Sequence, residues 1–63
     1  MPDDGQQHEI YFEFRAIGRS VKVSAVDAAT GIEVSVMGPA TASQADLQRL
    51  ALQKLMARLK ART

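Results

Sequence analysis

One stretch of the sequence has the residue types and the spacing of an anion-binding loop. Residues 34–47 read VSVMGPATASQADL, in which an alternating apolar segment reaches a Gly-Pro break and then a helix start. A strand, a glycine turn and a helix N-terminus can together bind a phosphate, because N–H groups at a helix start point at the anion. This loop has a single glycine, and Pro39 after it has no N–H to donate. Because Thr41, Ser43 and Asp46 can satisfy or complement the first helix amides, we interpret the loop as a structural turn.

The other side chains with chemical potential lack the partners that catalysis or metal binding requires. His8 is the single histidine, and it lies with several acidic residues in a Gln- and Gly-containing segment that fixes no ligand geometry. Without an ordered histidine as a base, the serine and threonine hydroxyls are not activated as nucleophiles. Glu13 and Glu33 fall on the outward face of the strands predicted below, where carboxylates stay solvated. We therefore expect no enzyme, no cofactor and no metal site.

Length and composition indicate one small domain. The 63 residues include no cysteine, so neither a disulfide nor a Cys-based zinc site can stabilise a core that is near the lower size limit. The polar, acidic start does not resemble a signal peptide, and no apolar run approaches the ~20 residues of a membrane span. We expect a cytoplasmic protein with no membrane partner, a flexible tail over residues 1–8 and a single domain over residues 9–63.

Alternating apolar residues predict three strands in an antiparallel meander of order 1-2-3. The first strand starts at Glu9, and Gly18-Arg19 suits a two-residue type II′ turn to a second strand over residues 20–26. A four-residue loop over residues 28–31 follows, in which Asp27 bonds to backbone amides and Gly31 is left-handed. The third strand covers residues 32–37 and ends at Gly38-Pro39. This register makes inward residues meet: Ala16 with Val21, Phe14 with Val23, Phe12 with Ala25, Ala25 with Val34, and Val23 with Val36.

The remaining segment predicts a helix. From Gln44 to about Arg62 there is no glycine, proline or β-branched residue, and capping-box spacing allows a start at Thr41 or at Ser43. A helix of ~28 Å matches strands of ~25 Å, so it can lie along the sheet and cover its apolar face. The fold class is α+β. The predicted core is Ile10, Phe12, Phe14, Ala16, Val21, Val23, Ala25, Ile32, Val34, Val36, Leu47, Ala51, Leu52, Leu55, Met56 and Leu59.

The order of these segments, carried by IYFEFRAIG, VKVSAVDAATGIEVSVMGPA and LQRLALQKL, resembles a family of small bacterial proteins of unknown function. The resemblance covers roughly residues 10–59 and rests on the overall pattern, since no catalytic motif is present. It implies a short, stand-alone intracellular protein, and it implies no activity, ligand or site.

The leading hypothesis for function is a non-catalytic protein-interaction or self-associating module. Its expected partner is a second copy of the chain, in a homo-oligomer, or an unknown protein. The predicted surface consists of outward apolar side chains on the open face of the sheet and one leucine off the main helix stripe: Tyr11, Val26, Met37 and Leu50. Edge pairing is a second route to association. Charges on Glu9, Glu13 and Arg15 discourage pairing at the first strand, so the third strand is the expected edge.

Weak nucleic-acid binding is the alternative hypothesis. Residues 1–43 hold six acidic and three basic side chains, whereas residues 44–63 hold one acidic and five basic ones. The segment order is similar to AP2-type and integrase arm-binding domains, which read DNA with the exposed sheet, but the outward face here carries two bases, two acids and one tyrosine. We interpret the helix bases as a solvated flank of the core. The candidate contacts are Arg15, Arg19, Lys22, Lys54, Arg58 and Arg62.

Overall fold

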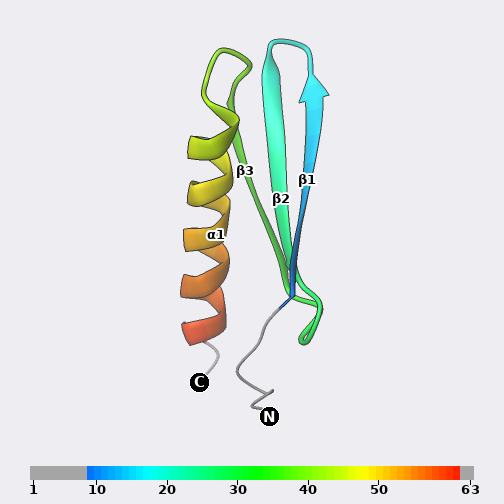
Figure 1. Ribbon diagram of the computed structural model, residues 1–63, viewed down its shortest axis with the longest axis vertical. Coiled ribbons are helices and arrows are strands. Elements are labelled where there is room, and N and C mark those ends of the chain that lie inside the picture. The colour runs from blue at the N-terminus through cyan, green and yellow to red at the C-terminus, as the bar shows by residue number, and fades with distance from the viewer. Residues whose placement is uncertain (1–8, 62–63) are drawn as a thin grey trace.

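The computed structural model of the protein describes residues 9–61, which form three strands followed by one helix (Figure 1). Strands β1 (Ile10–Ile17), β2 (Ser20–Asp27) and β3 (Glu33–Pro39) form an antiparallel sheet of order β1-β2-β3, and α1 (Gln44–Ala61) packs along it. The predicted α+β class and meander are confirmed. The tail predicted over residues 1–8, and with it His8, lies outside the described residues.

The first hairpin has the predicted register. Phe12 lies opposite Ala25 and Phe14 opposite Val23, so the inward residues of the two strands meet. Ile17 and Ser20 flank the turn, and Gly18 has a φ of 59°. A positive φ at this position is what a two-residue hairpin turn with the right-handed twist of its strands requires.

Asp27 organises the second turn. Its backbone N–H donates to the Ile32 carbonyl over 2.9 Å, and the Gly31 N–H donates to the Asp27 carbonyl over 2.7 Å. The Asp27 side chain is 0% exposed and accepts hydrogen bonds from the Ala29 N–H at 3.2 Å and the Thr30 hydroxyl at 3.0 Å. Gly31 has a φ of 77°, so the predicted aspartate turn with a left-handed glycine is confirmed.

Replacing Gly31 should test the turn without creating a clash, because a Cβ built there meets no atom within 4 Å. We expect Gly31→Val to lower the free energy of unfolding by about 1 kcal/mol or more, since a β-branched residue is disfavoured at positive φ. Urea unfolding measures the change. Gly31→Asn is the control and should lose less, because asparagine tolerates the left-handed conformation. A valine variant as stable as the parent would contradict this account of the turn.

Strand β3 ends two residues later than the sequence predicted. Gly38 pairs with Val21 and Pro39 with Ser20, so the Gly-Pro pair belongs to the strand. Proline is tolerated because β3 is an edge strand, where an N–H directed away from the sheet is not needed. The chain turns only after Pro39: the Ala40 N–H donates to the Arg19 carbonyl over 2.8 Å, and the Ala42 N–H donates to the Pro39 carbonyl over 2.9 Å.

Ser43, and not Thr41, is the N-cap of α1. Its hydroxyl oxygen accepts a hydrogen bond from the Asp46 N–H at 3.3 Å, and its carbonyl accepts one from the Leu47 N–H at 3.1 Å. Asp46 also forms an exposed ion pair with Arg49 at 2.9 Å, one turn into the helix. The Ser43 side chain therefore satisfies one of the first N–H groups of the helix. This is what the interpretation of residues 34–47 as a structural turn predicted.

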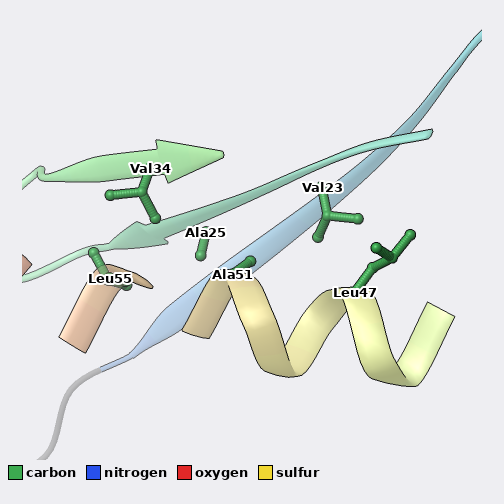
Figure 2. Close-up of a cluster of buried hydrophobic side chains, with 6 residues drawn as sticks. All are labelled: Val23, Ala25, Val34, Leu47, Ala51 and Leu55. Atoms are coloured by element: carbon green, nitrogen blue, oxygen red, sulfur yellow. The ribbon is translucent and has the colours of Figure 1, made fainter. Parts of the chain in front are cut away.

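The core lies between α1 and the strands β2 and β3 (Figure 2). Leu47, Ala51 and Leu55 repeat at intervals of four on the buried face of the helix, as an amphipathic helix requires. They meet three buried strand residues, Val23, Ala25 and Val34. Partly buried side chains surround this cluster: Ile10, Phe12, Val21, Ile32, Val36, Ala42 and Leu59.

Three residues of the predicted core are exposed. Phe14 is 37% exposed and Met56 is 41% exposed, and Ala16 is also exposed. The reason is the width of the helix. A helix is about 10 Å across, whereas strands are about 4.8 Å apart, so one helix covers about two strands. Because α1 packs on β2 and β3, the inward face of β1 lies beyond it (Figure 1).

Candidate functional site

The four residues of the predicted interaction surface do not form one patch. Tyr11 lies opposite Val26 on the outer face of the sheet, whereas Met37 lies opposite Lys22. Lys22 and Val26 are four residues apart on β2, a separation of about 13 Å along the strand. Leu50 is exposed on α1, which covers the other face of the sheet. Tyr11, Met37 and Leu50 are exposed singly, as apolar side chains of small proteins often are.

Tyr11 has a polar partner on the outer face. Its hydroxyl donates a hydrogen bond to Glu9 Oε1 over 3.1 Å. This hydrogen bond, together with the negative charge of Glu9, raises the pKa of the Tyr11 phenol above its ordinary value. The phenol is therefore neutral at pH 7, and its polar end is already engaged within the chain.

The candidate nucleic-acid contacts also lie on separate parts of the molecule. Arg15 lies opposite Lys22 on the outer face of the sheet, and Arg19 lies in the adjoining turn. Lys54 and Arg58 belong to α1 on the opposite side of the sheet. Arg62 is outside the described residues. The described cations thus form two small groups and no continuous basic surface.

Lys54 contacts the free edge of β3 at one carbonyl. Its Nζ donates a hydrogen bond to the Ser35 carbonyl over 2.8 Å. The Asp27–Ile32 pair is hydrogen-bonded. Hydrogen-bonded and non-hydrogen-bonded pairs alternate along an antiparallel ladder, so the even-numbered residues of β3 bond to β2 and the backbone groups of Ser35 point away from it. A lysine at this position discourages strand addition, and Pro39 at the same edge has no N–H. This contact argues against the third strand as the pairing edge, which the sequence favoured.

Among residues 9–61, no other segment pairs with the free edge of β1. The Ala28 N–H donates to the Glu9 carbonyl over 2.9 Å, which makes this pair a hydrogen-bonded one. By the same alternation, the backbone groups of the even-numbered residues 10–16 point away from β2. No other described residue forms a hydrogen bond with these groups. Eight residues of strand, Ile10–Ile17, can therefore accept another strand.

An apolar surface adjoins this open edge. Leu55 points into the core, and Lys54, about 100° away around the helix, reaches the edge of β3. Met56 is rotated about 100° in the opposite direction and so faces the β1 side, with Leu52 on the same flank. We call Phe12, Phe14, Ala16, Leu52 and Met56 the β1 surface. Phe12 packs against the core and Leu52 is partly buried, as their assignment to the core predicted, whereas Phe14, Ala16 and Met56 are exposed. Sequence reasoning placed these three in the core because it compared the lengths of helix and strands and left out their widths.

The described residues hold neither a metal-binding cluster nor a membrane-spanning helix. Across residues 9–61, no three His, Asp or Glu side chains are placed to hold a metal ion together. In the same part of the chain, no helix is long and apolar enough to cross a membrane.

The fold and the family agree with the sequence pattern. No curated protein matches the chain, and no solved structure does. A family model described as a domain of unknown function (DUF6898) matches residues 7–62, which is nearly the whole chain. The prediction of a family of unknown function with β-β-β-α order is confirmed. The chain therefore belongs to the DUF6898 family of domains of unknown function.

Proposed function

We propose that the protein is a non-catalytic interaction module that associates with a second copy of itself through β1. The observation that carries the proposal is the β1 surface, an apolar surface beside a free strand edge in which Phe14, Ala16 and Met56 are exposed and Phe12 and Leu52 are partly buried. Phe14 is the centre of this surface. It is a large aromatic side chain on the core face of the sheet, and it is 37% exposed to water.

The size of the domain supports the same proposal. A domain of about 60 residues buries only about 60% of the surface that its unfolded chain exposes, so its core is marginal. Within residues 9–61, the buried core consists of six apolar residues between one helix and two strands. A second copy adds apolar neighbours to Phe14 and Met56, and association that favours the folded form raises stability.

The choice of edge supports β1 as the route of association. The edge of β3 carries Lys54 on the Ser35 carbonyl and also Pro39, whereas the edge of β1 has no lysine and no proline. The charges on β1 that discourage pairing with an arbitrary strand have opposite signs at Glu13 and Arg15, so they can attract each other across two copies. Pairing at β1 also places the uncovered apolar faces of two copies next to each other.

Sedimentation equilibrium from low micromolar to near-millimolar concentration tests the proposal. We expect the mass to rise toward that of a dimer and the melting temperature to rise with concentration. Phe14→Lys should keep the mass at that of one chain. Met37→Lys is the matched control, because Met37 is an exposed apolar residue near the same end of the sheet but on its other face. A monomeric mass and a constant melting temperature for the parent protein would overturn self-association.

A further inference from the structure

We propose that two copies pair β1 with β1 in one defined antiparallel register, with a two-fold axis at Phe14. In this register Phe14 lies opposite Phe14 of the second copy, and Glu13 of each copy lies opposite Arg15 of the other. The inference rests on the self-association proposed above and specifies its geometry. Two independent features of β1 select this register: the direction of its free backbone groups and the position of its charges.

The backbone restricts the choice first. The groups that point to the free edge belong to the even-numbered residues Ile10, Phe12, Phe14 and Ala16. A ladder between two β1 strands must therefore pair even-numbered residues with even-numbered ones. The numbers of opposite residues then have an even sum, so the two-fold axis lies at a residue and not between two residues. Pairing even-numbered with even-numbered residues also places the apolar inward residues of one copy opposite those of the other, and the charged outward residues opposite each other. Hydrogen bonding and side-chain patterning thus require the same set of registers.

Charge then separates the registers that remain. At a two-fold axis, a residue lies opposite the same residue of the second copy. An axis at Glu13 places two carboxylates directly opposite, and an axis at Arg15 places two guanidinium groups opposite, both of which are unfavourable. An axis at Phe14 instead pairs Glu13 with Arg15 twice.

An axis at Phe12 is the remaining competitor. It pairs only residues 10–14 within β1, whereas an axis at Phe14 pairs residues 11–17. It places Arg15 opposite Glu9, a residue that precedes the strand and already accepts a hydrogen bond from Tyr11. The Phe14 axis therefore uses more of the strand and pairs charges that are not already engaged.

Within one chain, Glu13 and Arg15 have no opposite charge across the ladder. Glu13 faces Ser24, and Arg15 faces Lys22, a charge of the same sign. Both side chains are exposed, and neither forms an ion pair with another described residue. Pairing with a second copy gives Arg15 a carboxylate on its open side. The sheet then continues through six strands with both helices on one face and the two Phe14 side chains adjacent between them.

Charge reversal tests this register. Glu13→Arg and Arg15→Glu should each raise the dimer dissociation constant about tenfold or more, because two attractive pairs become two repulsive ones. A mixture of the two variants should form a heterodimer as tightly as the parent dimer, since each cation then meets a carboxylate again. The double variant E13R/R15E should also recover dimerisation. Glu33→Arg on β3 is the matched control and should leave dimerisation unchanged.

Cross-linking gives a second readout that does not depend on charge. The chain has no cysteine, so a single introduced thiol reports its own neighbour. Across the proposed axis, the two Cα atoms at position 14 are about 5.5 Å apart, and the side chains of such a hydrogen-bonded pair are too widely spaced for an unstrained disulfide but close enough for a short bifunctional thiol reagent. Phe14→Cys should therefore form a covalent dimer with a short thiol cross-linker, whereas Phe12→Cys, opposite Ala16, should remain monomeric.

The outcomes separate the register from the association itself. A parent protein that is monomeric overturns both. A parent that dimerises, together with Glu13→Arg and Arg15→Glu variants that dimerise equally well, overturns the register and leaves self-association standing. Sensitivity to Arg15→Glu alone, with cross-linking at position 12 and none at position 14, identifies the Phe12 axis and overturns the Phe14 axis.

Discussion

Leu55→Ala should lower the free energy of unfolding by about 2–5 kcal/mol, the largest loss that we expect from a single substitution in this protein. Leu55 is 0% exposed and belongs to the cluster that joins α1 to the sheet (Figure 2). Removing its terminal carbons loses apolar burial and leaves a cavity that the surrounding side chains fill only in part. Because small domains rarely have more than about 3–5 kcal/mol of net stability, the variant should be largely unfolded.

Met56→Ala is the matched control for this substitution. Met56 is the next residue of the same helix, but it is 41% exposed, so its truncation removes little burial. We expect a loss below about 1 kcal/mol, partly offset by the higher helix propensity of alanine. Circular dichroism with urea unfolding compares the two variants at the lowest usable concentration, where association through the β1 surface contributes least. Equal losses at the two positions would contradict the rotation of α1 described above.

The in-plane organisation of the sheet could be predicted from the sequence because it depends on local rules. Side chains alternate along a strand, and a shift of one residue would send the inward set to the wrong face. Two glycines, Gly18 and Gly31, then fix the lengths of the turns, and both have the positive φ that those turns require. The register of Phe14 with Val23, and of Val23 with Val36, follows directly from these constraints.

The lateral position of α1 could not be predicted in the same way, because it depends on contacts between residues distant in sequence. The helix stripe shows which residues face the sheet but not which two of the three strands they meet. Lys54 illustrates the difficulty: its hydrogen bond to the Ser35 carbonyl exists only because α1 lies beside β3. The uncovered β1 surface is a consequence of the same displacement. A comparison of helix width with strand spacing would have indicated that one strand must remain open.

Gly38 is the position on β3 where the Leu47 side chain of α1 comes closest to the strand backbone. A Cβ built at Gly38 would lie 2.5 Å from Leu47 Cδ2 and 3.2 Å from Leu47 Cδ1, although Leu47 is a buried core residue. The absence of a side chain at Gly38 therefore leaves room on β3 for the terminal carbons of Leu47 from the first turn of α1. Real Cβ atoms essentially never come within 3.0 Å of such a neighbour, so a substitution must move the helix or the Leu47 side chain.

Gly38→Ala should accordingly destabilise the protein by about 1–3 kcal/mol through overpacking. Leu47→Ala should cost about 2–5 kcal/mol alone through lost burial. In the double variant the new methyl group enters the space that Leu47 vacates, so the combined loss should be smaller than the two single losses together. A coupling of about 0.5–3 kcal/mol is typical for residues in direct contact. Losses that simply add in urea unfolding would contradict the close approach of Leu47 to Gly38, which is one of the contacts that hold α1 against β3.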